Sequence, residues 1–279
     1  MNKKITPLFL LTLKLFFLIS CKVQRPINYG NDTNFKIIVN ADKGLKRFNR
    51  KVEVFGIDIY AATKVDDTKL LHAVNVMAQY LDNNEDGIAD DQLVLDKMIE
   101  NKAYLVMWYK QSDLRRSNVN GRIGQDLGNE ETHPDFVSNG KINDFDATLE
   151  EVLHLINNAG HSFAYPDAFG QKIGSNLANA MDIARGGQFM TIPKQYPSNT
   201  WFSYDDNTCD YANCQTIEYL YWALTSILGA QENRLDEIEN EWKLNTKLKV
   251  ETTDSLIFSL LSNPAYKMPK LLPDGTYRH

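Results

Sequence analysis

The sequence predicts an α+β domain in which a mixed sheet packs against helices. Three observations support this class. Short segments that read as strands lie in the first part of the chain, up to residue 109. One long amphipathic segment, residues 66–81, separates them, and three further helical segments follow. No internal repeat or linker interrupts residues 35–279, so we expect them to form a single domain of this class.

Two strands are predicted at the start of the domain, over residues 35–39 and 52–60. In the second, Phe55, Ile57 and Ile59 fall on one face, because side chains alternate along a strand. Residues 104–109 form an unbroken apolar and aromatic run, as expected of a buried strand. Residues 111–145 are rich in Gly, Asn, Asp and Ser, which predicts loop with short strands.

The helical segments follow from apolar residues at helical spacing. Residues 66–81 carry such a stripe behind a capping Asp66 or Asp67, and a shorter helix with Leu95, Met98 and Ile99 turned inward follows the acidic loop. Three more helices are predicted over residues 146–159, 174–185 and 215–230, the first of them ended by Gly160. Residues 191–214 read as a long loop, and long ordered loops are often functional.

Composition excludes several classes of protein. The 279 residues include 30 Lys and Arg against 36 Asp and Glu, a formal charge of −6, with no long basic run. Nucleic acid is therefore not the expected partner, because phosphate binding depends on clustered basic side chains. The one continuous apolar stretch lies at the N-terminus, which excludes a multi-span membrane protein.

Residues 1–20 have the pattern of a secretory signal peptide. Lys3 and Lys4 precede an apolar segment that is short for a membrane span and ends at Ser20 and Cys21. Leu18-Ile19-Ser20-Cys21 also resembles the bacterial lipobox, which implies that Cys21 is lipidated and that residues 21–34 are a polar tether. We therefore expect an extracytoplasmic lipoprotein, anchored to a bacterial membrane on the periplasmic side or at the cell surface. An ordinary signal peptide or a poor membrane anchor is the alternative.

Two cysteines remain if Cys21 carries lipid. Cys209 and Cys214 are an even pair, and in an oxidising compartment such a pair predicts a small disulfide. Two cysteines alone would make an incomplete zinc site.

An acidic loop over residues 82–93 predicts a calcium site. Oxygen ligands at loop positions 1, 3, 5, 7 and 9, with Gly87 at position 6, suit a hard cation, and these ligands are Asp82, Asn84, Asp86, the Ile88 carbonyl and Asp90. The loop resembles that of an EF-hand, flanked by two helices, with a structural role for the ion. It departs from the pattern at position 12, where Leu93 replaces the bidentate Glu. A solvated turn without an ion is the alternative.

The helix predicted over residues 146–159 carries candidates for chemistry. Glu150 and His154 are one turn apart and can point at a shared ion, while Glu151 sits at the side, where a base acting on bound water would lie. The segment Glu150-Glu151-x-x-His154 resembles the zincin metallopeptidase motif His-Glu-x-x-His, with Glu150 in place of the first His. The resemblance implies that Glu150 and His154 are ligands of zinc or another divalent transition metal and that Glu151 is the general base.

The resemblance also implies a third ligand. In the gluzincin branch this ligand is a Glu on a downstream helix, and Glu218 matches it as the one charged residue among apolar neighbours in 216–228. His161 and His133 are alternative ligands. The hydroxyl groups of three tyrosines are candidate donors to an oxyanion: Tyr204, Tyr219 and Tyr221.

Structural explanations compete with each of these roles. Thr148 and Glu151 have the spacing of a capping box, which would make Glu151 a stabiliser of the helix start. Acids at Glu150 and Glu218 also favour the first turn of a helix. We expect His72 and His279 to face water.

Two functions are consistent with the sequence. The first is a calcium-stabilised extracytoplasmic lipoprotein that hydrolyses a peptide or protein substrate with metal-activated water. The second is a non-catalytic, calcium-stabilised surface binding protein that uses the loop 191–214 to contact a partner. The sequence leaves the oligomeric state open.

Overall fold

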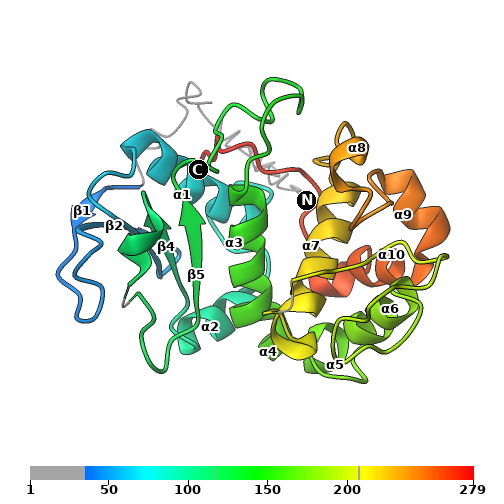
Figure 1. Ribbon diagram of the computed structural model, residues 1–279. Coiled ribbons are helices and arrows are strands. Elements are labelled where there is room, and N and C mark those ends of the chain that lie inside the picture. Colours follow the sequence, from blue (N-terminus) through cyan, green and yellow to red (C-terminus); the bar gives the residue numbers. More distant parts are fainter. Residues whose placement is uncertain (1–34, 116, 207) are drawn as a thin grey trace, which may run out of the picture.

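The computed structural model describes residues 35–115, 117–206 and 208–279. A five-stranded mixed sheet lies on one side of the molecule and most of the later helices lie on the other, with helix α3 (Thr148–Ile156) between them (Figure 1). The predicted α+β class, with a mixed sheet and helices, is confirmed. The signal, the lipidation residue Cys21 and the tether fall in residues 1–34, outside the described residues.

The sheet has the strand order β1-β2-β3-β4-β5. The first two pairs are antiparallel and the last two are parallel, so β5 is an edge strand beside α3 (Figure 1). Of the predicted run 104–109, Tyr104–Trp108 form the buried strand β4, whereas Tyr109 lies beyond it and is exposed. The strands span Ile38–Val39 (β1), Arg50–Val54 (β2), Ile57–Ala61 (β3), Tyr104–Trp108 (β4) and Gly124–Gly128 (β5).

The single strand predicted over residues 52–60 is instead a hairpin. Phe55 and Gly56 form a two-residue turn between β2 and β3, with φ of 49° and 85°. Two-residue hairpin turns favour positive φ. Apolar residues stand before, within and after the turn, so the sequence shows no polar interruption that would mark two separate strands. Ile57 and Ile59 are buried as predicted, whereas Phe55 lies in the turn.

Helices α1 (Asp67–Leu81) and α2 (Gln92–Glu100) flank the acidic loop. The predicted cap is present, since the Asp66 carboxylate accepts a hydrogen bond from the backbone N–H of Thr68. In α2, Leu95 and Met98 are buried as predicted, but Ile99 is 46% exposed. The Ile99 side chain lies over the hairpin turn at Gly56 rather than in the core.

Gly160 does not end the helix that begins with α3. The helix continues as a π-helical turn, η2 (Asn157–His161), and then as α4 (Ser162–Ala164). A Cβ atom at Gly160 would lie 2.7 Å from Val94 Cγ1, so glycine here permits α2 to approach closely. Close packing between helices, rather than termination, explains this glycine.

The second half of the molecule is helical. Two of its helices were predicted: α6 (Asn176–Ala184) lies within residues 174–185, and α7 (Thr216–Ile227) lies within residues 215–230. The helices after residue 230 were not predicted. The remaining elements are η1 (Gln111–Leu114), α5 (Pro166–Phe169), α6 (Asn176–Ala184), η3 (Tyr211–Gln215), α7 (Thr216–Ile227), α8 (Leu235–Ile238), α9 (Lys247–Thr253), α10 (Ser255–Leu261) and η4 (Pro264–Tyr266).

The segment after η4 returns to the first half of the molecule. The Tyr277 hydroxyl donates a hydrogen bond of 2.7 Å to Asp82 Oδ2, and the amide of Gln79 donates to Asp274 Oδ1 at 2.9 Å. This segment therefore covers the end of α1 and the start of the acidic loop. In the part of the chain that the structure describes, no helix combines the length and apolar character needed to cross a membrane.

Candidate metal centre

A buried contact between Asp146 and His72 fixes the start of α3. Asp146 lies two residues before the helix and pairs with His72 Nε2 at 2.7 Å, so His72 does not face water. The same carboxylate accepts the backbone N–H of His133 and of Thr148 at 3.0 and 3.2 Å. Burial opposes ionisation of Asp146, but His72 and these hydrogen bonds hold its pKa below the usual range.

Three side chains of α3 converge on one point. Ligand atoms of Glu150, Glu151 and His154 all lie within 4.8 Å of one another, and among the described residues this is the one such group of three His, Cys, Asp or Glu side chains. His154 Nδ1 lies 3.4 Å from Glu151 Oε2. The helical spacing read from the sequence therefore places these three side chains together, as it predicted.

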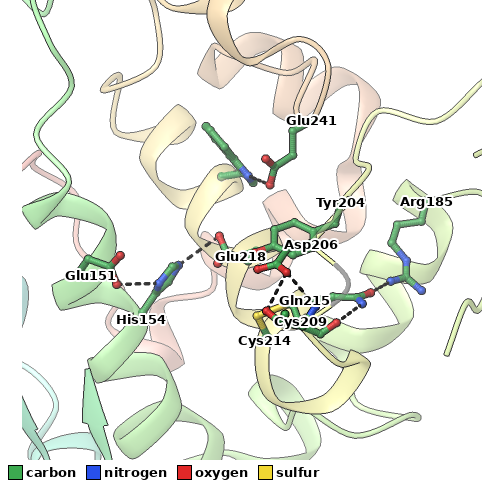
Figure 2. The surroundings of a disulfide bond; sticks show 12 residues. Glu151, His154, Arg185, Tyr204, Asp206, Cys209, Cys214, Gln215, Glu218 and Glu241 are labelled. Atoms are coloured by element: carbon green, nitrogen blue, oxygen red, sulfur yellow. Dashed lines mark hydrogen bonds and ion pairs between the residues drawn. A yellow bond between two sulfur atoms is a disulfide. The ribbon is translucent and has the colours of Figure 1, made fainter. Parts of the chain in front are cut away.

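Helix α7 brings a fourth group from a distant part of the chain. Glu218 Oε2 lies 3.5 Å from His154 Nε2, so the imidazole is held between carboxylates of two helices (Figure 2). The Tyr204 hydroxyl donates to the other oxygen of Glu218 at 3.4 Å. Glu218 therefore contacts the Nε2 side of His154, but it lies outside the group of three side chains whose ligand atoms are all within 4.8 Å of one another.

The start of α7 is held by covalent and polar contacts. Cys209 and Cys214 lie at disulfide-bonding distance, with Cα atoms 5.3 Å apart (Figure 2). Gln215 donates to the Cys209 carbonyl at 2.9 Å and accepts a hydrogen bond from the fully buried Arg185. These contacts lie within one turn of Glu218 and restrict its position.

The electrostatics of the group favour added positive charge. Burial raises the pKa of Glu150 to about 8, with Glu218 and Glu151 adding to the shift and His154 opposing it. Burial disfavours the imidazolium form of His154, yet Glu218 and Glu151 raise its pKa well above the usual range. His154 Nε2 is buried without a hydrogen bond among the described residues. Three carboxylates thus lie around one imidazole, and a divalent cation would neutralise their excess negative charge.

The capping-box explanation for Glu151 is wrong. Thr148 lies inside the first turn with its hydroxyl unpaired within the described structure, and Ala147 occupies the cap position. Glu151 Oε2 instead accepts a hydrogen bond from the Gln125 amide on β5 and faces His154. The carboxylate is therefore turned into the site and not back along the helix.

The sequence did not reveal several carboxylates around the group. Burial raises the pKa of Asp126 and of Glu131, and the charge of Glu151 contributes to both shifts. On the other side, burial raises the pKa of Glu241 to about 7. These residues follow from tertiary packing, and none belongs to a local motif that could have identified it.

His161 and His133 do not join this group. His161 is buried beside a cavity of about 20 Å³ that Asp90 and Asp91 also line, and burial lowers its pKa to about 4. His133 contributes its backbone N–H to Asp146. His161 therefore lies toward the acidic loop, away from the point where Glu150, Glu151 and His154 meet.

The three tyrosines predicted as oxyanion donors do not all lie at the site. Tyr204 contacts Glu218, and the Tyr221 hydroxyl lies close enough to Glu150 to lower the pKa of that carboxyl. Tyr219 points elsewhere, because its hydroxyl donates to Asp254. Two of the three hydroxyl groups thus border the site.

The acidic loop is held by its own hydrogen bonds. Asp82 accepts the backbone N–H groups of Asp86 and Gly87 at 3.1 and 2.7 Å, and Asn84 accepts that of Asp86 at 3.0 Å. Gly87 has φ of 89°, which explains the glycine at position 6. Burial raises the pKa of Asp90, and Asp82 and Asp86 add to the shift. Leu93, in place of the usual Glu, is exposed and provides no ligand.

Comparison of the chain with protein-family models, with curated proteins and with solved structures gives no match. The class of protein therefore has to be inferred from the fold and from the geometry of the Glu150, Glu151, His154 and Glu218 group.

Proposed function

We propose that this protein is a metal-dependent hydrolase with a zincin-like arrangement, acting on a peptide or protein substrate. The observation that carries the proposal is the position of His154, whose ring nitrogens face Glu151 on one side and Glu218 on the other. Glu150, His154 and Glu218 would hold a divalent cation such as zinc, and Glu151 would act as the general base.

One separation between the proposed donors fits a small tetrahedral ion. Two donors that each lie about 2.1 Å from such an ion are themselves separated by about 3.4 Å. The separation between His154 Nε2 and Glu218 Oε2 is 3.5 Å. A bound ion would supply a Lewis acid and a water of lowered pKa at this position.

Glu151 has an oxygen available for proton transfer. The contacts with Gln125 and with His154 both fall on Oε2. The contact at Oε2 would orient the His154 ring through Nδ1, as carboxylates beside metal-binding histidines commonly do. For Oε1 to accept the proton from the attacking water, the Glu151 side chain would have to turn from the Nδ1 side of the ring toward a metal on the Nε2 side.

Elemental analysis of purified protein, with hydrolysis of a peptide library, tests this function. We expect one tightly held transition metal that survives in Glu151→Gln and is lost in His154→Ala, with hydrolysis lost in both. His133→Ala is the matched control and should keep both metal and activity. Protein that retains only calcium, with unchanged stability in the Glu151 and His154 variants, would instead support the non-catalytic surface binding protein.

We also propose that the loop 82–93 binds calcium in an EF-hand-like manner. Its ligands would be Asp82, Asn84, Asp86, the Ile88 carbonyl and Asp90. Calcium at a hundred times its dissociation constant should stabilise the fold by about 2.7 kcal/mol. The shift in melting temperature should vanish in Asp86→Asn and persist in the control Asp96→Asn, an exposed residue of α2. A calcium-independent melting temperature in the unmodified chain would exclude the site.

Export and lipid anchoring remain proposals from residues 1–34. Expression in a bacterial host with labelled palmitate should label the chain and place it in the membrane fraction. Cys21→Ser should abolish the label. Release of the unmodified chain as an unlabelled exported protein would instead indicate an ordinary signal peptide.

A further inference from the structure

A cavity of about 370 Å³ opens beside the Glu218 side of the proposed metal centre. Two lining residues connect it to that centre: the Tyr204 hydroxyl donates to Glu218, and Glu241 lies close enough to Glu218 and His154 for their charges to affect its pKa (Figure 2). The walls combine aromatic rings with carboxylates and one cation, Arg234; the aromatic and acidic residues are Tyr196, Tyr204, Trp222, Asp205, Glu237 and Glu241.

The carboxylates of this cavity are not equally engaged. Glu237 pairs with Arg234 at 3.1 Å, and the Arg234 guanidinium lies over the ring of Phe145, 3.9 Å from its centroid. Glu241 accepts a hydrogen bond of 2.8 Å from the neutral indole N–H of Trp222. No basic side chain forms an ion pair with Glu241 in the ranges that the structure describes. The carboxylate of Glu241, like that of the exposed Asp205, therefore has capacity for a new cation, and Glu241 is the more buried of the two.

We propose that this cavity binds the positively charged side chain of a lysine or arginine in a peptide substrate, beside the bond that is hydrolysed. The inference rests on the proposed hydrolase function, since it assigns a substrate class to that site. Glu241 would pair with the cation, while Trp222 and Tyr204 would present aromatic surface to it and to its aliphatic stem.

The aromatic rings and the carboxylates that line the cavity both favour a cationic ligand. Aromatic faces attract cations within about 6 Å of the ring centroid. Burial, with the charges of Glu218 and Asp205, raises the pKa of Glu241 to about 7, so a cation would relieve this unfavourable ionisation. An acidic ligand would meet repulsion from the same carboxylates.

Three matched peptides test the proposal by equilibrium binding to the full chain carrying Glu151→Gln, loaded with zinc. They differ at one position, which holds lysine, norleucine or glutamate, so charge changes while the stem of lysine and norleucine is shared. We expect the lysine peptide to bind about tenfold more tightly than the norleucine peptide, and the glutamate peptide to bind most weakly.

Glu241→Gln should reduce the lysine preference to about twofold or less, while Trp222 keeps a hydrogen-bond acceptor at that position. The control is Glu239→Gln, an exposed residue on the same segment that does not line the cavity. It removes the same charge and should leave the preference unchanged. Equal binding of the three peptides, or an undiminished preference in Glu241→Gln, would overturn the proposal.

Hydrolysis measurements separate this inference from the function on which it rests. A lysine preference in binding, with no hydrolysis by the unmodified metal-loaded chain, would support the cation pocket and refute the hydrolase. Hydrolysis that is indifferent to the three peptides, with no preference in binding, would support the hydrolase and refute the pocket.

Discussion

His154 on α3 and Glu218 on α7 face each other across the junction of the sheet-bearing half and the helical half, with Nε2 and Oε2 3.5 Å apart. The two residues are 64 positions apart in the sequence, and only the packing of α3 against α7 brings them together. The site therefore depends on both halves of the molecule, and substitutions in either half can test it.

Glu218→Gln should weaken metal binding while preserving the fold. The amide keeps the size of the side chain but removes the negative charge facing His154, and loss of a ligand should exceed the 10- to 100-fold cost usual for outer-shell partners. Metal affinity measured by competition with a chelator checks this. The control Glu239→Gln should bind metal like the unmodified chain, and equal affinity in both variants would remove Glu218 from the ligand set.

Asp146→Asn should destabilise the protein by about 1–3 kcal/mol at pH 7, since it removes the carboxylate that three buried hydrogen-bonding groups share. The folded-state pKa of Asp146 lies below its ordinary value of 3.8, so its contribution is present above that pH and is lost as the pH falls through the folded pKa. Urea unfolding between pH 3 and 7 should show the two proteins converging in acid. A constant difference across this range would contradict the assignment.

Glu241→Gln should give the opposite pH dependence. The folded-state pKa of about 7 lies above the ordinary value of 4.5, so ionisation of Glu241 costs stability as the pH rises through 7. Between pH 4.5 and 8, the free energy of unfolding of the variant should therefore rise relative to that of the unmodified chain, by up to about 3 kcal/mol. Thermal unfolding at a series of pH values measures this, and parallel stability curves would show that Glu241 is not perturbed.

Removing the disulfide should affect both stability and the site. Cys209 and Cys214 are five residues apart, and a loop of this size predicts a loss of about 2 kcal/mol in Cys209→Ala/Cys214→Ala. Because Cys214 lies one turn before Glu218, metal affinity should also fall. Chelator competition on the double variant reads out the second effect, and unchanged affinity would mean that packing alone positions Glu218.

Gly160→Ala should destabilise the junction of α2 and η2 by about 1–3 kcal/mol, because the new methyl group would lie 2.7 Å from Val94 Cγ1. Val94→Ala removes the atom that collides. In the double variant, the added cost of the alanine at position 160 should be smaller than in the parent background. Purely additive effects would point to a backbone requirement at Gly160.

The sequence was most informative where function depends on spacing within one element. Helical geometry placed Glu150, Glu151 and His154 on neighbouring positions, and a single charge in an apolar helix singled out Glu218. Asp66 as a cap and Leu95 and Met98 as core residues followed from the same periodicity.

The sequence was least informative where close tertiary contacts override a local signal. The turn at Phe55 and Gly56 carries apolar residues on both sides, so it read as one strand. Gly160 read as a helix end, although packing against Val94 is what requires it. No residue near His72 in the sequence indicates its contact with Asp146, and Glu241 comes close to the site only through the packing of the helical half.

The hydrogen bond from Tyr277 to Asp82 spans 195 residues of chain. A ring of this size is slow to close during folding, because its entropy must be lost before the contact forms. The acidic loop thus acquires its covering only after both halves have assembled, and protection of its amides from hydrogen exchange would be among the last to develop.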